Sequence, residues 1–214
     1  TRPRSEIMAH MKQENLGLVS VRQIKTGESW QHAFVGNHLI ECCLVSSQTS
    51  EIGYVFPLYL YPEQDSAPAF LPLDDLPQPI QQKTANIDQR VLQKLEQIYD
   101  KTISPEEFLY YVYAVLYSPT YRETYAPFLK IDYPRIPFTS DAEVFEGMAK
   151  LGERLKDLHL LQSKELEDSV VRFQGQGDDT IKYRRYDPEQ KRLYINENYY
   201  FENLEPEVWE YQIG

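Results

Sequence analysis

Apolar residues in the first quarter of the chain gather in short runs, rich in Val, Ile, Phe and Tyr, that turn-forming residues separate. Runs of this kind are typical of β-strands. Strands that follow one another closely, with short links, favour an antiparallel sheet. The pattern predicts a short helix over residues 5–13 and strands over residues 17–23, 32–35, 38–46 and 53–61.

From residue 86 onward the apolar spacing becomes that of helices. Ser104, Pro105 and Glu107 form a helix start, with serine as the N-cap, proline at the first position and glutamate at the third. This helix is predicted to run over residues 108–117, and Ser118 with Pro119 starts another over residues 120–128. An earlier helix is indicated by a single face that carries Ile87, Val91, Leu95 and Ile98.

A longer helix is predicted over residues 143–161, after an extended segment that prolines fix at residues 130–138. Thr139 or Ser140 is its expected N-cap. Beyond it, strand-forming runs at residues 170–174, 180–186 and 192–195 predict a small terminal sheet. The stripe that this long helix is expected to bury is Val144, Met148, Leu151, Leu155 and Leu158.

Together these elements predict an α+β fold, with an antiparallel β-rich N-terminal part, a helical middle and a small C-terminal β-sheet. Prolines and acidic residues crowd residues 62–79 and prevent regular ladders and helices there. The expected division is a β-rich part at 1–62, a proline-rich linker or loop at 63–85, a helical scaffold at 86–165 and a terminal sheet at 166–214. Since the chain begins without Met, we expect a fragment of a longer polypeptide, cut short within its last sheet.

Charge is distributed unevenly along the 214 residues, whose net charge is −11. Residues 1–62 contain five basic and five acidic side chains, so the whole acidic excess lies in residues 63–214. A chain this acidic is not a general nucleic-acid binder. If it contacts a polyanion, the first 62 residues are the surface that is repelled least.

The sequence contains no complete catalytic motif. Phosphate-binding glycine loops, nucleophile elbows and the spacing of metal ligands are all absent, so no catalytic residue, metal or cofactor is predicted in this chain. One nuclease-like pattern combines Asp178 and Asp179 with Glu189 and Lys191, which could hold a divalent ion. A tight turn over residues 187–190 explains these charges better.

The two cysteines, Cys42 and Cys43, are neighbours within a predicted strand. Neighbouring residues of a strand point to opposite faces, so no disulfide is expected between them. This favours a reducing, cytoplasmic setting. No run of eighteen apolar residues is present, so we expect no membrane span.

Several blocks of sequence resemble a known family: the target-recognition and C-terminal region of single-polypeptide (type ISP) restriction–modification enzymes and related adenine-specific DNA methyltransferases. The similarity spans nearly the whole chain. The blocks are RPRSEIMAHM at residues 2–11, ENLGLV at 14–19, RQ at 22–23, TSEIGYVFPLYLYP at 49–62, YYVYAVLYSPTYRETYAPFLKIDYPRIPF at 110–138, YIN at 194–196 and VWEYQIG at 208–214.

The resemblance implies that this chain recognises double-stranded DNA and is not catalytic by itself. A methyltransferase domain that binds S-adenosylmethionine is expected upstream, often with helicase and nuclease modules, in a bacterial defence enzyme. Sequence-specific contacts are expected from the strands and loops of residues 17–61. The alternative that the sequence leaves open is an acidic protein-interaction or scaffold domain without DNA contact; an autonomous nuclease acting through Asp179 and Glu189 is a weaker third hypothesis.

Candidate DNA contacts follow from side-chain chemistry within these first residues. Arginine, glutamine and asparagine match the donors and acceptors of base edges, and lysine and arginine bind phosphates. Each candidate has a structural alternative: Arg22 could pair with Glu28 or Glu41, and Asn37 follows Gly36 as a turn signal. The expected base contacts are Arg22, Gln23, His32, Asn37 and Gln48, and the expected phosphate contacts are Arg2, Arg4, Lys12 and Lys25.

Overall fold

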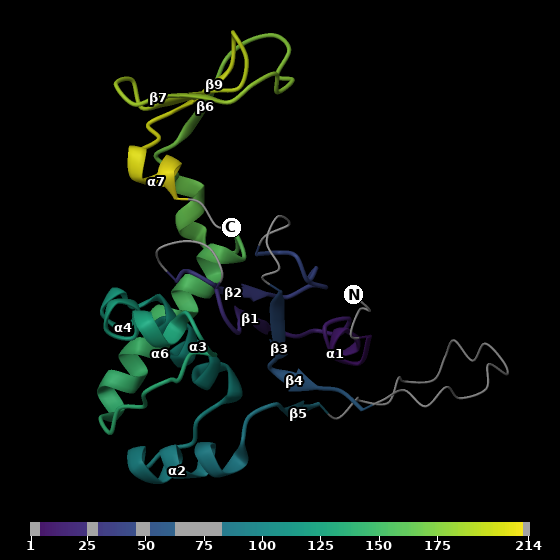
Figure 1. The fold of residues 1–214 in the computed structure, drawn as a ribbon, viewed down its shortest axis with the longest axis vertical. Coiled ribbons are helices and arrows are strands. Elements are labelled where there is room, and N and C mark those ends of the chain that lie inside the picture. Colours follow the sequence, from purple (N-terminus) through teal and green to yellow (C-terminus); the bar gives the residue numbers. More distant parts are fainter. Residues whose placement is uncertain (1–4, 25–29, 46–51, 63–82, 212–214) are drawn as a thin grey trace, which may run out of the picture. The chain divides into compact units, whose positions relative to one another are not determined.

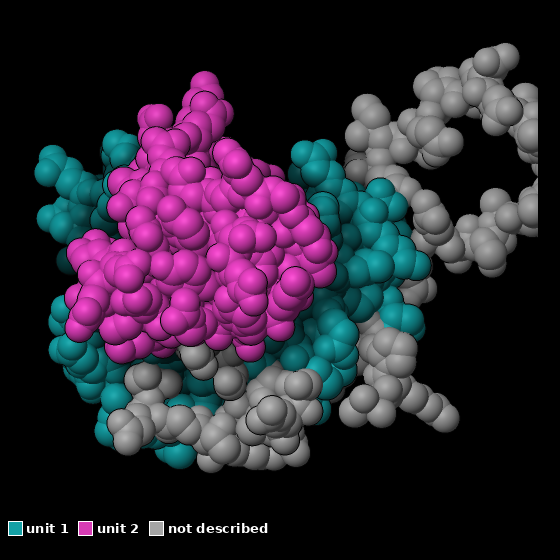
Figure 2. All heavy atoms as spheres, turned by 90° about the horizontal axis from the view of Figure 1, so that it is seen from above, with its two compact units in different colours: residues 1–160 teal, residues 161–214 magenta. Residues whose placement is uncertain are grey.

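The computed structural model describes residues 5–24, 30–45, 52–62 and 83–211 of the chain (Figure 1). The chain forms two compact units, residues 1–160 and residues 161–214, which Figure 2 distinguishes by colour. Helices and antiparallel sheets both occur, so the predicted α+β class is confirmed. Among the described residues, no helix is long and apolar enough to cross a membrane.

The first unit begins with a short helix and a three-stranded antiparallel sheet in which β1 lies between β2 and β3 (Figure 1). Leu18 at the second position of β1 pairs with Val35 of β2 and with Phe56 of β3, which fixes the register. The predicted helix and three of the four predicted strands are therefore present. Their bounds are α1 Ser5–His10, β1 Gly17–Val21, β2 Ala33–Gly36 and β3 Gly53–Pro57.

Both faces of the central strand β1 are covered, whereas β2 and β3 are mostly half-buried. On one face, Ala33 belongs to the helical core and Leu18 packs against that core. On the other face, Val19 is fully buried, and the neighbouring glycine positions contact Met11 and Val45. A strand whose two faces are both packed cannot present its side chains to a ligand. Only the ends and the edges of this sheet are therefore available for recognition.

A strand predicted over residues 38–46 does not form, and residues 38–45 turn instead. The carboxylate of Glu41 accepts the backbone N–H of Cys43, and the Leu44 N–H donates to the Glu41 carbonyl oxygen at 3.2 Å. These local bonds use backbone groups that a strand would need for its ladder. The apolar run still contributes one buried side chain, Val45, while Leu39 and Leu44 are exposed.

The predicted strand over residues 53–61 is interrupted at Leu58, whose N–H donates to the Leu16 carbonyl oxygen at 2.7 Å. After the interruption β4 (Tyr59–Leu60) pairs antiparallel with β5 (Thr84–Ala85), inside the segment predicted as linker. Buried Asn15 fixes this point, since its side-chain amide donates to the Tyr59 carbonyl oxygen and accepts the Tyr59 N–H.

The helical part follows the local start signals of the sequence. The Ser104 hydroxyl accepts the backbone N–H of Glu107, and the Ser104 N–H donates in return to the Glu107 carboxylate. Ser118 caps the next helix. Both predicted starts are confirmed, although the second helix is divided at Tyr125. The bounds are α2 Gln89–Tyr99, α3 Pro105–Tyr117, α4 Pro119–Thr124, α5 Ala126–Leu129 and α6 Ala142–His159.

The buried faces of α2 and α6 differ from the predicted ones. On α6 the buried residues are Phe145, Ala149 and Gly152, one position after the predicted Val144, Met148 and Leu151. On α2 they are Leu92, Leu95 and Tyr99, whereas Val91 and Ile98 are exposed. Apolar residues sit at adjacent positions in both helices, so either stripe satisfies helical spacing, and the packing partner decides. The N-cap of α6 is Asp141, not Thr139 or Ser140.

Tyrosine hydroxyl groups attach the helices to the extended segment that precedes α6. Prolines in this segment remove backbone donors, and its carbonyl oxygens need partners from elsewhere. The many tyrosines, 17 in the chain, include three that supply these partners while burying their rings. The bonds run from Tyr99 to the Thr139 carbonyl oxygen at 2.6 Å, from Tyr111 to Pro137 at 2.8 Å and from Tyr121 to Arg135 at 2.9 Å.

A histidine at the end of α6 gives the first unit a pH-dependent stability. The Nδ1 atom of His159 lies 2.6 Å from the hydroxyl of Tyr113, and burial lowers the pKa of His159 below its ordinary value of 6.5, with the charge of Arg122 lowering it further. The pKa of His159 is lower in the folded state than in the unfolded state. The contribution of neutral His159 to the free energy of unfolding is therefore complete above about pH 6.5 and is lost as the pH falls further.

We therefore expect the unfolding free energy to fall between pH 7.5 and pH 5.5, more in the wild-type chain than in His159→Gln. Urea unfolding at both pH values measures this difference. The carboxylates are shared by both proteins, so their titration cancels in the comparison. An equal pH dependence of the two proteins would contradict the assignment to His159.

The second unit contains a four-stranded antiparallel sheet in the order β6–β9–β8–β7. The sequence predicted three strands; β9 was missed, and within predicted residues 180–186 only the end becomes strand. Buried Asn196 explains this, since its amide donates to the carbonyl oxygens of Asp178 and Thr180 and holds them outside a ladder. The bounds are η1 Lys164–Asp168, β6 Arg172–Gln174, β7 Arg185–Asp187, β8 Arg192–Tyr194, β9 Tyr200–Glu202 and α7 Pro206–Glu210.

Candidate nucleic-acid interface

One end of the three-stranded sheet gathers the long connections of the first unit. Val21 ends β1 opposite Gly53, where β3 begins, and Ser20 pairs with Ala33, where β2 begins. The chain therefore leaves β1, enters β2 and enters β3 at the same end of the sheet (Figure 1). Residues 22–24 and 30–32 of the connection from β1 to β2, and residue 52 of the connection from β2 to β3, therefore lie at this end.

Arg22 and Gln23 follow β1 directly at this end, and both are exposed. The Nε atom of Arg22 lies 3.4 Å from Oδ1 of Asp132, and both side chains are more than half exposed. Such an exposed pair is worth at most about 1 kcal/mol, so Arg22 can exchange this partner for a ligand. Its partner is thus Asp132, and not Glu41 as the sequence suggested; Glu28 lies outside the described residues.

The segment around Asp132 supports this end of the sheet from the helical side. The N–H of Ile24 donates to the Lys130 carbonyl oxygen at 3.2 Å. The ring of Tyr133 meets the rings of Tyr54 and Phe56 on β3 edge to face, with centroid distances of 5.5 and 5.7 Å. Aromatic contacts of this geometry each add about 0.5–1.5 kcal/mol to packing. The described part of the 22–32 connection thus begins from a rigid base.

His32 is placed for packing and not for a base contact. Only 6% of its surface is exposed, its Nδ1 atom accepts the Gln31 N–H at 3.2 Å, and its ring lies against Trp30. The guanidinium of Arg122 lies over both the Trp30 ring and the Tyr117 ring, which anchors this strand entry to the helices. A base edge cannot reach a ring that is buried in this way.

The remaining candidates are separated from Arg22 and Gln23. Gly36 pairs with Gly17 at the opposite end of the sheet, and partly exposed Asn37 follows it there. Lys12 is exposed and follows Met11, which packs against Gly17 at that same end. Four predicted contacts lie outside the described residues: Arg2, Arg4, Lys25 and Gln48.

Comparison with known proteins assigns the chain to a family. The family described as Type ISP C-terminal specificity domain matches residues 1–214, the whole chain. The chain belongs to this family. The resemblance inferred from the sequence blocks is therefore confirmed. No curated protein matches the chain.

Solved structures share the fold of this specificity domain at low sequence identity. The ATP-dependent Type ISP restriction-modification enzyme LlaBIII bound to DNA matches with a TM-score of 0.67 and 22% identity, over 94% of this chain and 12% of that one. The DrdV-DNA complex gives 0.65 and 21%, over 94% and 19%. A nuclease-deletion mutant of the Type ISP enzyme LlaGI with a DNA substrate mimic gives 0.60 and 20%, over 94% and 13%. The specificity domain thus spans less than a fifth of each of these chains.

Carboxylates in and beside the nuclease-like pattern of the specificity domain accept hydrogen bonds within turns. Asp178 accepts the N–H and the hydroxyl of Thr180. Asp187 accepts the backbone N–H groups of residues 189 and 190, both at 3.1 Å. Lys191 pairs with Glu205 at 2.7 Å. These bonds favour the turn interpretation over a metal-dependent nuclease.

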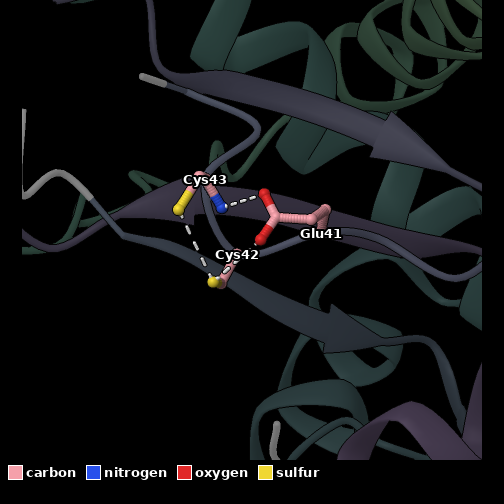
Figure 3. A group of neighbouring side chains, drawn as sticks. All are labelled: Glu41, Cys42 and Cys43. Carbon is pink, nitrogen blue, oxygen red and sulfur yellow. Dashed lines mark hydrogen bonds between the residues drawn. The ribbon is translucent and has the colours of Figure 1, made fainter. Parts of the chain in front are cut away.

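A second cluster of possible ligand atoms lies in the turn after β2. The carboxylate of Glu41 accepts the Cys42 thiol at 3.1 Å and the Cys43 N–H at 2.5 Å, and the two sulfur atoms are 3.7 Å apart (Figure 3). The hydrogen bond from the Cys42 thiol contributes most to lowering the pKa of Glu41, and the bond from the Cys43 N–H lowers it further. The bond between Cys42 and Glu41 also raises the pKa of Cys42. Both cysteines are free thiols. The three groups already satisfy one another as a turn.

The sequence did not indicate one set of side chains of the kinds that contact nucleic acids, an exposed arginine beside two half-buried tyrosines. Arg185, Tyr194 and Tyr200 lie side by side on one face of the second unit's sheet, because Arg185 pairs with Tyr194 and Tyr194 with Tyr200. The available signal was the alternation of polar and apolar residues in these short strands. Pairing across strands could not be read from it, since β9 was not predicted.

Proposed function

We propose that this specificity domain recognises a sequence of duplex DNA for a longer restriction–modification polypeptide. The observation that carries the proposal is the match of all 214 residues to a family of specificity domains. The three similar structures are DNA complexes, which is consistent with this role. No observation favours the alternative, an acidic scaffold without DNA contact.

The covered faces of the central strand β1 direct recognition to the ends of the β2–β1–β3 sheet. Arg22 and Gln23 lie at the end where β1 ends and β3 begins, and a guanidinium or a carboxamide can bond two atoms of one base edge. Such a bidentate contact discriminates against the wrong base by ~1–3 kcal/mol. We assign Arg22 and Gln23 to base contacts, and Gln48, outside the described residues, remains a prediction of the same kind.

Phosphate contacts would position the domain along the duplex without reading its sequence. Lys12 lies near the opposite end of β1 from Arg22, and this five-residue strand spans about 13 Å. This span is less than half of the ~34 Å turn of the double helix, so one duplex can contact both ends. Arg2, Arg4 and Lys25 are proposed to act in the same way.

The remaining chemistry is proposed to lie outside this chain. An upstream methyltransferase domain of the same polypeptide would bind S-adenosylmethionine and receive the target adenine, flipped out of the duplex. The specificity domain would hold the duplex in the register that brings this adenine to that domain. The acidic excess of residues 63–214 would face protein or solvent, away from the phosphates. A cytoplasmic location fits this role.

The proposal is tested by selecting bound duplexes from a pool with a randomised centre, and then measuring affinity for the selected sequence. Arg22→Ala is expected to weaken this affinity by roughly tenfold and to relax the preference at one base pair. Arg90→Ala, a loss of equal charge at an exposed residue of α2, is the control and is expected to change neither. If the wild-type chain enriches no sequence and binds no duplex even at low salt, the proposed function is wrong.

A further inference from the structure

The sheet of the second unit has two unlike faces, because its side chains alternate. One face carries Phe173, Phe201, Leu193 and Tyr186 as neighbours across the four strands. The rings of Phe173 and Phe201 are 4.8 Å apart, and Trp209 of α7 stacks on Tyr186 at 5.4 Å. Ring contacts thus join the side chains of this apolar face, which are only partly buried, and Phe173 is 48% exposed. The opposite face carries the polar side chains.

The opposite face has one row whose charges compensate each other. Arg172 pairs with Glu202, and Asp187 pairs with Arg192, whose guanidinium lies 3.9 Å from the Glu202 carboxylate. Cations and anions thus alternate across the four strands. Cross-strand pairs of this kind contribute to the register of the sheet and leave little net charge for a ligand.

A second row on the same face is polar and aromatic. We call it the Arg–Tyr row; its members in spatial order are Gln174, Tyr200, Tyr194 and Arg185. The Tyr194 and Tyr200 rings are 5.4 Å apart, and the guanidinium of Arg185 lies 4.7 Å from the Tyr194 ring centre. Stacking of this type fixes the plane of a guanidinium and leaves its N–H groups free to donate at the edge.

Arg185 donates to nothing within the described part of the chain: its side chain forms no hydrogen bond and no ion pair there. Its counterpart Arg192 stacks on Tyr200 at 4.4 Å but already bonds Gln190 at 3.2 Å. Arg185 is therefore a pre-oriented donor group that lacks an acceptor. An exposed guanidinium held in one plane suits two parallel bonds to a phosphate or to a guanine edge.

The charge of the residues around Arg185 is a second, independent reason to expect an anionic ligand here. The residues Lys182, Arg184 and Arg185 place three cations among four consecutive residues, without an acidic one, in a chain whose net charge is −11. All three side chains are exposed. Arg185 begins β7, which is an edge strand of the sheet, and Lys182 and Arg184 lie in the segment directly before it. The sheet thus offers a polyanion a positive edge beside aromatic rings.

From this geometry we propose that the Arg–Tyr row and the β7 edge form a second DNA-contact surface of the specificity domain. The inference rests on the proposed function and adds a binding surface to it. The major groove, ~12 Å wide, admits a two-stranded β-ribbon, and the edge strand β7 with its antiparallel neighbour β8 is such a ribbon, about 5 Å between strand axes. In this arrangement Arg185 donates to a base edge, and Lys182 and Arg184 contact phosphates.

The test measures the affinity of the full chain for its selected duplex as a function of salt. Arg185→Ala is expected to reduce this affinity by roughly tenfold and to relax the preference at one base pair. Arg185→Lys keeps the charge but not the planar fork, so it is expected to retain the salt dependence and to lose the preference. Lys164→Ala, in the same unit but in η1, is the control with an equal loss of charge and is expected to behave as wild type.

The outcomes separate this inference from the function on which it rests. If the wild-type chain selects its duplex but both Arg185 variants keep the same binding and base preference, the proposal of a second surface is wrong. The proposed function is then unaffected. A wild-type chain that selects no duplex overturns both. Arg185 is exposed on an edge strand, and equal thermal unfolding of the variants shows that loss of folding does not cause the result.

Discussion

Replacing Gly152 with alanine is expected to lower the free energy of unfolding by about 3 kcal/mol. Helices α3 and α6 pack so closely at this position that an added Cβ would lie 1.8 Å from the Tyr110 carbonyl oxygen. The obstacle is backbone, which cannot rotate away as a side chain could. The two helices must separate, and every contact in their interface is weakened. Urea unfolding followed by circular dichroism measures the loss.

The matched control is Gly147→Ala on the same helix, where an added Cβ meets nothing within 4 Å. Alanine is the better helix former, so this variant is expected to gain about 0.5–1 kcal/mol. Opposite signs at two glycines of one helix would identify close packing as the cause. Similar values at both positions would show that α3 and α6 do not approach as described.

Phe145→Ala is expected to cost about 3–5 kcal/mol, the other large effect. The side chain is fully buried on α6, with its ring 4.7 Å from that of Tyr111 and 4.9 Å from that of Tyr99. Removing it leaves a cavity where α2, α3 and α6 meet, and these elements are fixed by other contacts and cannot close it. Thermal and urea unfolding should both report the loss.

Val144→Ala tests the same helix one position earlier, on the stripe that the sequence favoured. Half of the Val144 surface is exposed, so the expected change is within about 0.5 kcal/mol. The difference between the two neighbours measures which face of α6 enters the core. If Val144→Ala lowers the free energy of unfolding more than Phe145→Ala does, the face of α6 predicted from the sequence is the buried one.

Stability and recognition are linked in this domain through a few residues. The base of the 22–32 connection is fixed by Trp30, which lies under Arg122, and by Ile24, which bonds Lys130. Both contacts join the sheet to the helical part. A rigid base of this kind reduces the conformational entropy that the connection would lose on binding. The helices therefore support the end of the sheet at which Arg22 and Gln23 lie.

The sequence alone determined the features that depend on near neighbours in the chain. Ser104 with Glu107 and Ser118 with Pro119 started helices where expected, because a cap needs only residues three positions away. Short runs rich in Val, Ile, Phe and Tyr predicted β1, β2 and β3 for the same reason, and long matching blocks identified the family. The predicted first strand was two residues too long, since β1 ends at Val21 and Arg22 and Gln23 follow it as exposed residues.

Tertiary structure decided the features that depend on distant partners. Phe145, and not its sequence neighbour Val144, enters the core, because α3 packs against the face of α6 that carries Phe145. His32, an expected base contact, is buried in the structure, and strand pairing places Arg185 beside Tyr194. Local sequence fixes where an element begins and which periodicity it has, whereas contacts between residues far apart in the chain select which of its faces is buried and which can bind DNA.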